Sequence, residues 1–326
     1  MIKPKNQHAS GSLFRNSRSF YELYRKEFSE HLNSRRFHII YFLLLIVSIA
    51  SLAAGASNIS VSSDSTSFIF LKIFTTSSSS VYSFATFMAF LGPLMGITLG
   101  FDAINSERSL GTLNRLVSQP IYRDNIINAK FLAGASVVTM TVFSLGMLIS
   151  GLGLILIGVP PSGEEIFRIF CYLALTSVYI SFWLALSVVF SVICRHAATA
   201  AITGISIWLF SCLFMSTLAG GIADLVYPTE GLQGLMNMNS NYTLELALER
   251  ISPYYLFVEA VTTIMNPSVR SIGLVSMSQI SGAISGSLSA GQSLLLVWPH
   301  IVILIAITMI GFTVSYICFM RQEIRA

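Results

Sequence analysis

Residues 101–130 read FDAINSERSLGTLNRLVSQPIYRDNIINAK, a polar stretch that carries charges of both signs. Long apolar runs flank it, at about residues 81–101 and 131–158. Charged side chains are costly inside hydrocarbon, so a stretch of this kind must lie in water beside a membrane. This segment, here named the island, therefore indicates a membrane protein and separates its second and third spans.

The composition places most of the chain in a membrane. Apolar residues make up 54% of the chain and charged residues 10%, whereas soluble domains carry roughly a quarter charged residues. A helix needs about 20 mostly apolar residues to cross the hydrocarbon core. Six runs are long enough, at about residues 37–57, 81–101, 131–158, 167–193, 197–221 and 294–320. Because these runs are continuous and not alternating, they predict an all-α integral membrane protein with six transmembrane helices.

The basic residues predict the orientation of the chain. Fifteen of the 19 Lys and Arg residues lie before the first run, in the island, at Arg195 or after the last run. The others, Lys72, Arg168, Arg250 and Arg270, lie on the opposite side. The positive-inside rule then places both termini and the island in the cytoplasm, with the protein in the cell or inner membrane. A long charged leader precedes the first run, so no cleavable signal peptide is expected.

The segments outside the spans divide the chain further. Residues 1–36 form a cytoplasmic leader, in which residues 17–36 predict an amphipathic helix at the membrane interface. A solvated leader that only sets the topology is the alternative. Residues 37–320 form the transmembrane domain. Within this domain, two long connections join spans, the island at residues 102–130 and an external loop at residues 222–293. Residues 321–326 form a cytoplasmic tail.

The external connection 222–293 contains one predicted helix. Ser252 suits an N-cap, Pro253 suits the first helical turn, and Pro267 would end the helix. Apolar residues cover almost all of its circumference, so we expect it to lie on the bilayer surface or dip into it. Residues 58–80 predict a Ser- and Thr-rich external loop with an apolar centre.

The sequence lacks the motifs of several function classes. It has no GxxxxGK[ST] loop for ATP, no HExxH zinc pair and no GxSxG nucleophile elbow. The centres of the six runs contain no Asp, Glu, Lys, Arg or His, which argues against a carrier driven by protons or sodium ions. The four cysteines lie in or at the ends of apolar runs, without CxxC spacing. We expect no catalytic site, cofactor or metal in this chain, and no nucleic-acid partner.

The residue sequence of the island predicts a short helix. Asn105 or Ser106 can cap it, Glu107 then lies in the first turn, and Pro120 ends it. Four residues at three- and four-residue steps form one apolar edge: Leu110, Leu113, Leu116 and Val117. Such an edge suits the groove of a soluble partner, and it suits a membrane-surface helix without a partner equally well.

Seven island residues follow the pattern E-x-x-x-G-T-L-x-x-L-x-x-x-P-x-x-R: Glu107, Gly111, Thr112, Leu113, Leu116, Pro120 and Arg123. This pattern resembles that of the ABC-2 type permeases, in the branch that includes the membrane subunit of nitrous-oxide-reductase maturation transporters. The resemblance implies a type V exporter-like fold and a dimer of six-span subunits, each docked to a cytoplasmic ATPase that binds ATP and Mg. It makes these seven residues coupling residues, and none of them catalytic.

Three functions are compatible with the sequence. The first, favoured by the resemblance, is the membrane subunit of an ATP-driven exporter, coupled to its ATPase through residues 102–130. The second is a stand-alone channel or carrier, which would show flux without nucleotide. The third is a membrane scaffold without transport, which would have no ATPase partner. The apolar and aromatic residues of the spans do not select a cargo.

Overall fold

The computed structural model describes residues 7–61, 68–77, 81–111, 122–267 and 288–321. Within these ranges the chain is helical and contains no strand. In chain order the helices are α1 (Gln7–Asn33), α2 (Arg35–Val61), α3 (Ile69–Thr75), α4 (Phe84–Gly100), α5 (Asn105–Ser109), α7 (Arg123–Ile157), α8 (Gly163–Ile193), α9 (Ala197–Leu209), α10 (Met215–Val226), α11 (Gly231–Glu249), α12 (Pro253–Met265) and α14 (Ala290–Arg321). A π-helical turn, Phe210–Phe214, joins α9 to α10.

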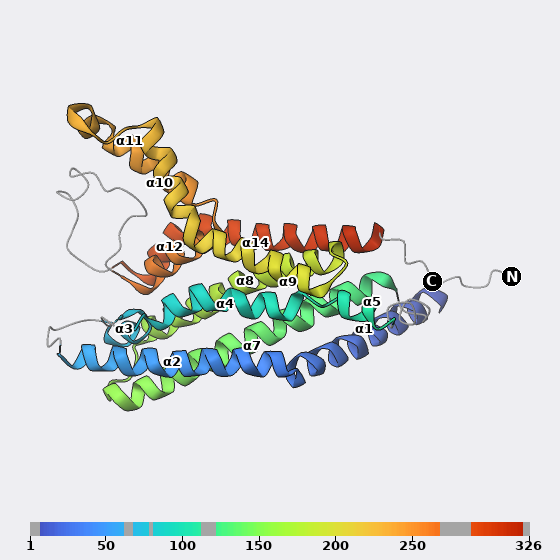
Figure 1. The fold of residues 1–326 in the computed structure, drawn as a ribbon. Coiled ribbons are helices and arrows are strands. Elements are labelled where there is room, and N and C mark those ends of the chain that lie inside the picture. Colours follow the sequence, from blue (N-terminus) through green and yellow to red (C-terminus); the bar gives the residue numbers. More distant parts are fainter. Residues whose placement is uncertain (1–6, 62–67, 78–80, 112–121, 268–287, 322–326) are drawn as a thin grey trace.

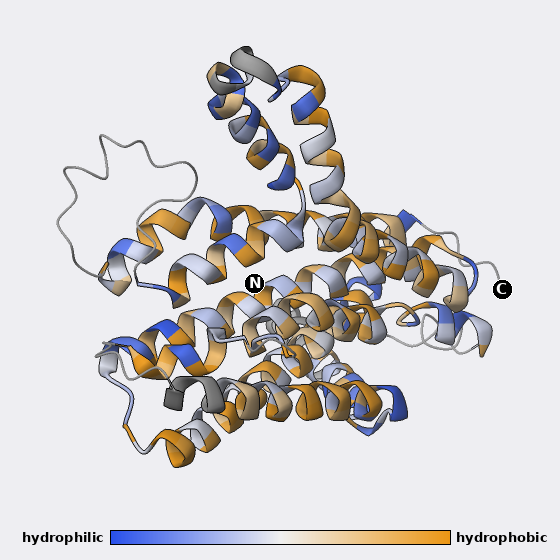
Figure 2. Ribbon diagram, turned by 60° about the vertical axis from the view of Figure 1, so that its left-hand side comes forward, coloured by the Kyte–Doolittle hydropathy of each residue, from blue (hydrophilic) through white to orange (hydrophobic). Residues whose placement is uncertain are grey.

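Six helical segments are long and apolar enough to cross a membrane: α2, α4, α7, α8, the continuous α9–α10 segment and α14. They form one elongated bundle (Figure 1), and each apolar run of the sequence falls in one of them. Apolar residues dominate these helices, while polar residues gather mainly at helix ends and in α11 (Figure 2). The predicted all-α fold with six membrane helices is therefore confirmed.

The bundle has two different ends. One end, named the α5 end, holds α1, α5, the start of α7 and the last residues of α14 (Figure 1). The opposite end, named the α12 end, holds α3 and α12. The first and last described helices therefore reach the same end, as six membrane crossings require.

Helix α8 occupies the centre of the bundle. It packs against α4, α7, α9, α12 and α14. In its most apolar stretch 72% of the residues are buried within the protein, compared with 17% in α14. The packing of α8 therefore fixes the arrangement of the other spans, whereas α14 leaves most of its apolar surface for lipid.

The contact between α4 and α8 depends on small residues. Gly92, Gly96 and Gly100 recur at every fourth position of α4 and face α8. A Cβ atom on Gly96 would lie 2.5 Å from the backbone oxygen of Ile180, so no side chain fits there. Small residues at this spacing let membrane helices approach closely and gain contact over their backbones.

Side chains of α8 also satisfy the backbone of α4. Pro93 lies inside α4 and has no N–H, so the carbonyl oxygen of Ala89 lacks its usual helical donor. The Tyr179 hydroxyl donates to this oxygen at 2.9 Å. About two turns further along α8, the Ser187 hydroxyl donates to the Ile97 carbonyl oxygen of α4 at 3.0 Å. Because no water reaches the membrane interior, these bonds hold α4 in register with α8.

The leader forms a longer helix than predicted. α1 begins at Gln7 and ends at Asn33, where Ser34 separates it from α2. The predicted apolar positions face the protein, with Leu23 buried and Tyr24 half-buried against α7. The Tyr24 hydroxyl donates to the Ser136 hydroxyl of α7 at 2.9 Å. The apolar face of α1 is therefore covered mainly by α7.

The loop predicted at residues 58–80 contains a buried helix. α3 packs between α2, α4, α7 and α8 and buries four residues: Phe70, Leu71, Ile73 and Phe74. Glu165 of α8 accepts a hydrogen bond from the backbone N–H of Phe70 at 2.9 Å, which fixes the start of α3. Sequence periodicity missed this helix because seven residues are too few to show a helical repeat.

The predicted external loop 222–293 is mostly helical where it is described. α10 and α11 form a hairpin that projects away from the bundle (Figure 1), and the Asn241 amide of α11 donates to Asp224 of α10 at 2.8 Å. α12 begins at Pro253 and ends before Pro267, as predicted.

Much of the apolar surface of α12 contacts protein, and the expectation that α12 lies on the bilayer surface or dips into it stays a prediction. α12 packs against α4, α8 and α14, and its Phe257 ring stacks on Tyr179 with centroids 4.2 Å apart. Ser252 precedes the helix as predicted, but its hydroxyl donates to the Ser211 carbonyl at 3.0 Å and does not cap α12. An apolar circumference suits a helix enclosed by protein as well as one in lipid.

An ionic cluster joins α11, α12 and α14 at the α12 end. Glu259 of α12 binds Arg250 through two contacts, at 2.7 and 2.9 Å, and lies 2.7 Å from the Nε2 atom of His300. Burial alone would raise the pKa of Glu259, but the hydrogen bonds and charges of His300 and Arg250 lower this pKa to about 2. The cluster ties the projecting hairpin to the bundle.

Replacing Glu259 with Gln is expected to lower the free energy of unfolding by about 1–3 kcal/mol at pH 7, because the charge-assisted contacts with Arg250 and His300 are weakened or lost. A carboxylate with a lowered pKa stabilises the fold above its unfolded pKa of about 4.3, and this contribution disappears as the pH falls through the folded value. The difference between the two proteins should therefore shrink below about pH 4. Denaturant unfolding at several pH values measures it. The exposed Glu230→Gln serves as control, and an equal effect of both changes would contradict the prediction.

Candidate functional site

The first part of the island forms α5, and this helix is shorter than predicted. α5 ends at Ser109, and Gly111 has a left-handed φ of 68°, a conformation that glycine adopts at helix ends. The single helix predicted from Asn105 to Pro120 is therefore interrupted after Leu110. Gly111 therefore follows the end of α5 in a conformation that favours glycine.

The seven predicted coupling residues divide into two sets. The described residues are Glu107, Gly111 and Arg123. Thr112, Leu113, Leu116 and Pro120 lie outside the described residues, so their predicted role stays a prediction.

Helix α5 is attached directly to the end of α8. The Ser191 hydroxyl of α8 accepts the backbone N–H groups of Ile104 and Asn105, at 3.0 and 3.3 Å. The cap predicted from Asn105 or Ser106 is thus supplied by another helix, because the buried start of α5 faces α8. Arg108 in turn donates to the carbonyl oxygens of Val192 and Cys194, at the C-terminal end of α8, at 3.4 and 3.3 Å.

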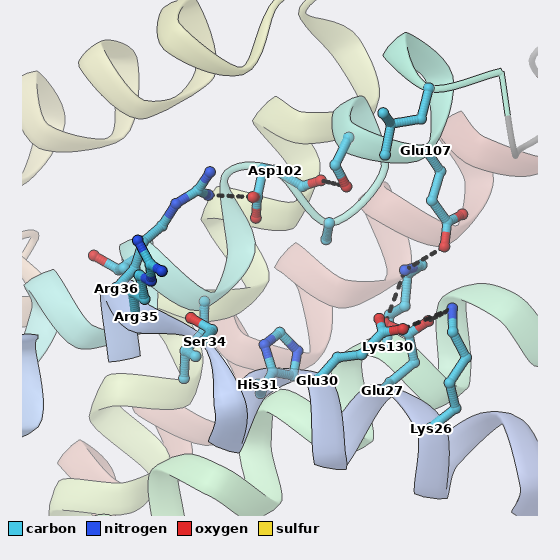
Figure 3. A pocket seen from close by; sticks show the side chains of 15 residues that line it. Lys26, Glu27, Glu30, His31, Ser34, Arg35, Arg36, Asp102, Glu107 and Lys130 are labelled. Carbon is cyan, nitrogen blue, oxygen red and sulfur yellow. Dashed lines mark hydrogen bonds and ion pairs between the residues drawn. The ribbon is translucent and has the colours of Figure 1, made fainter. Parts of the chain in front are cut away.

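A buried ionic triad joins α5 to α1 and α7. The Lys130 ammonium of α7 lies 2.8 Å from a carboxylate oxygen of Glu107 and 2.9 Å from one of Glu27 (Figure 3). The three side chains are only 5%, 10% and 5% exposed, respectively. Burial alone would raise the pKa of Glu27, but the charge and hydrogen bond of Lys130 keep this pKa below its ordinary value. The three buried side chains are therefore held together by contacts to a single ammonium group.

The sequence predicted Glu107 as a site residue but missed both of its partners. These partners are Lys130, at the start of the third span, and Glu27, in the leader helix. Lys130 is 103 positions from Glu27 in sequence, so no helical spacing could reveal the contact. A weak signal existed, since Lys130 and Glu107 carry opposite charges beside adjacent membrane spans.

Arg123 lies apart from this triad. Its guanidinium contacts the Phe319 carbonyl oxygen of α14 at 3.5 Å and lies 5.6 Å from the centroid of the Phe319 ring. The start of α7 is thereby joined to the end of α14. Glu107 lies on α5 and Gly111 directly after it, whereas Arg123 lies at a different helix contact.

A pocket of about 510 Å³ lies between α1, the start of α2, the end of α4 and α5 (Figure 3). Arg36 of α2 forms an ion pair with Asp102, which lies three positions before the start of α5, and stacks over the Phe101 ring at 5.0 Å. Lys130, Glu107 and the α1 side chains line the other part of the pocket. Helices α1, α2, α7 and α8 thus all hold the segment around α5.

The charged side chains around α5 mostly contact one another. Ion pairs join Lys130 to Glu27 and Glu107, and Arg36 to Asp102, whereas the buried side-chain amide of Asn105 has no hydrogen-bond partner among the described residues. Among the described residues, no group of three or more His, Cys, Asp and Glu side chains is placed to hold a metal ion. A displacement of α5 would instead act directly on α8 through Ser191 and on α7 through Lys130.

The fold defines a multi-pass membrane protein with six membrane-length helical segments. The sequence model of the ABC-2 family transporter proteins matches residues 21–324, so the chain belongs to this family. The family resemblance drawn from the island is confirmed, and the chain is an ABC-2 transporter permease.

One relative shows a partial match. The "Probable ABC transporter permease protein NosY" of Stutzerimonas stutzeri is 32% identical over 120 residues, which covers 36% of this chain and 39% of that protein. The match therefore spans well under half of the relative.

Proposed function

We propose that this chain is the permease subunit of an ATP-driven exporter and forms the translocation path with a second permease subunit. A separate ATPase, which binds ATP and Mg, docks at the α5 end and moves α5 during its cycle. In this proposal the α5 end faces the cytoplasm, in agreement with the distribution of Lys and Arg.

The attachment of α5 to three other helices carries this proposal. Ser191 and Arg108 join α5 to α8, and Lys130 joins it to both α7 and α1. Because α8 packs against four other described spans, movement of α5 reaches most of the bundle. A loop that only connected two spans would not require a buried ionic triad, which is costly to desolvate.

Replacing Leu110 with Asp is expected to weaken binding of the ATPase at least about tenfold, since it puts a charge into an apolar contact. Leu110 is 75% exposed at the end of α5, so the change should leave the fold intact. Transport and cargo-stimulated ATP hydrolysis should fall together. Co-purification of the permease with its ATPase measures the binding.

Leu225→Asp is the matched control, because Leu225 is 84% exposed on the hairpin at the α12 end. It should leave ATPase binding unchanged. Full ATPase binding by the Leu110→Asp permease would refute docking at this site. Cargo flux in vesicles that contain the permease alone, without nucleotide, would instead identify a channel or carrier.

A further inference from the structure

The pocket at the α5 end opens at the edge of the membrane. The first span begins at Arg35, and the pocket is lined by residues just before that point and just after the end of α4. Its volume of about 510 Å³ falls in the range of about 300–1,000 Å³ that is usual for small-ligand sites. A molecule in it would lie at the level of the lipid headgroups.

Charges in this pocket are separated by sign. Near the start of α2, Arg35 and Arg36 face a single carboxylate, Asp102 (Figure 3). This part of the pocket therefore carries an excess of positive charge. Arg36 is paired with Asp102, while Arg35 is exposed at the pocket rim.

The other end of the pocket carries an excess of negative charge. Three carboxylates lie there with two ammonium groups: Glu27, Glu30 and Glu107 with Lys26 and Lys130 (Figure 3). Glu30 is the accessible member, with a side chain 58% exposed and 3.3 Å from Lys26. Glu30, on α1, and Arg35, at the start of α2, lie five positions apart in sequence, with Ser34 between the two helices.

Apolar residues continue from the positive end of the pocket into the membrane. Ile39, Phe42 and Ile46 are 68%, 56% and 64% exposed on α2. They follow Arg35 at four, seven and eleven positions and so lie on the same face of the helix. Passing from the membrane into the pocket, a ligand would thus meet apolar surface first, then positive charge, and then negative charge.

We infer that this pocket binds the headgroup of a phospholipid with a primary ammonium, of the phosphatidylethanolamine type. The phosphate binds Arg35 and Arg36, the ammonium donates to Glu30, and the acyl chains lie along Ile39 and Phe42. In such a lipid the phosphate lies between the acyl chains and the ammonium, which matches the order of charges in the protein. An anionic headgroup without an ammonium leaves the acidic end unpaired, and a trimethylammonium has no N–H to donate.

The test uses the full-length permease in vesicles of equal parts dioleoyl-phosphatidylethanolamine, -phosphatidylcholine and -phosphatidylglycerol. Lipids that remain bound after extraction are counted by native mass spectrometry. We expect phosphatidylethanolamine to be retained about tenfold over the other two, the affinity expected from one charge-assisted hydrogen bond. Equal retention of the three lipids would overturn the inference.

Two variants separate the contributions of phosphate and ammonium. Glu30→Gln should abolish the preference over phosphatidylcholine, and Arg35→Gln should lower retention of all three lipids about tenfold. Arg321→Gln, an exposed arginine at the same end of the bundle, should change nothing. If the Glu30→Gln and the Arg35→Gln permease both kept the full preference for phosphatidylethanolamine, the inference would be overturned.

Two further outcomes would assign the pocket to another occupant. If soluble glycerophosphoethanolamine or inorganic phosphate displaced the lipid at equal concentration, the site would belong to a free phosphate compound. If Ile39→Cys formed a disulfide between two copies of the permease in the vesicle, protein would cover the apolar face. Either result would overturn binding of a lipid.

Discussion

Replacing Lys130 with Met is expected to lower the free energy of unfolding by about 3–5 kcal/mol, the cost of leaving buried charges without a partner. The Lys130 ammonium lies 2.9 Å from Glu27 and 2.8 Å from Glu107, and both carboxylates are at least nine-tenths buried. Without it, these two carboxylates repel each other across the contact between α1 and α5. Under the proposed function, ATP hydrolysis should then proceed without transport, because α5 is no longer held to α7. Denaturant unfolding in detergent and transport in vesicles measure the two effects.

The pH dependence and a triple variant identify the cause. Protonation of the carboxylates removes their repulsion, so the loss of stability should be smaller at pH 5 than at pH 8. Glu27→Gln and Glu107→Gln combined with Lys130→Met should restore most of the stability, since no buried charge remains. Lys26→Met is the control, as Lys26 is 47% exposed and should contribute less than about 1 kcal/mol. An equal loss for Lys26→Met and Lys130→Met would show that the triad has no special role.

Replacing Gly96 with Ala is expected to destabilise the bundle by about 1–3 kcal/mol, and Gly96→Leu by more. The new Cβ atom would lie 2.5 Å from the Ile180 oxygen and 2.9 Å from the Leu184 nitrogen. Both are backbone atoms of the central helix α8, so neither can rotate away. The helices must separate, which also strains the hydrogen bonds that α8 side chains donate to α4.

Gly151→Ala is the matched control for this change. Gly151 also lies within a membrane-length helix, α7, and a Cβ atom there would meet no atom within 4 Å. Alanine favours the helix by about 1 kcal/mol over glycine, so this variant should be as stable as the unmodified protein or more so. Thermal unfolding of both variants in the same detergent tests the pair. Equal stability of Gly96→Ala and Gly151→Ala would contradict the close α4–α8 contact.

The membrane spans were predictable because the bilayer imposes a length and an apolar character on each of them. The helix α3 was not predicted, because seven residues are too few to show a helical repeat. The start and end of α12 were still predicted, since Pro253 and Pro267 act through local backbone geometry. The orientation and the domain limits stay predictions.

At the candidate site, helix-capping preferences predicted Glu107 in the first turn of a helix. The position of Pro120 predicted that this helix would continue until that residue. The left-handed φ of Gly111 ends that helix early. Glycine can adopt the left-handed conformation but does not have to, so the residue type alone did not predict that the helix would end before Gly111. The predicted coupling roles of the seven island residues await the experiments above.

Composition and spacing by themselves determined that this chain crosses a membrane six times and carries a charged island after its second span. Those properties follow from each segment alone, because the cost of placing a residue in lipid is nearly independent of the rest of the chain. Only the tertiary structure decided that Glu27, Glu107 and Lys130 share one buried triad and that α4 lies directly on the backbone of α8. Contacts of this kind join residues far apart in sequence, and their energies exist only once the helices have packed.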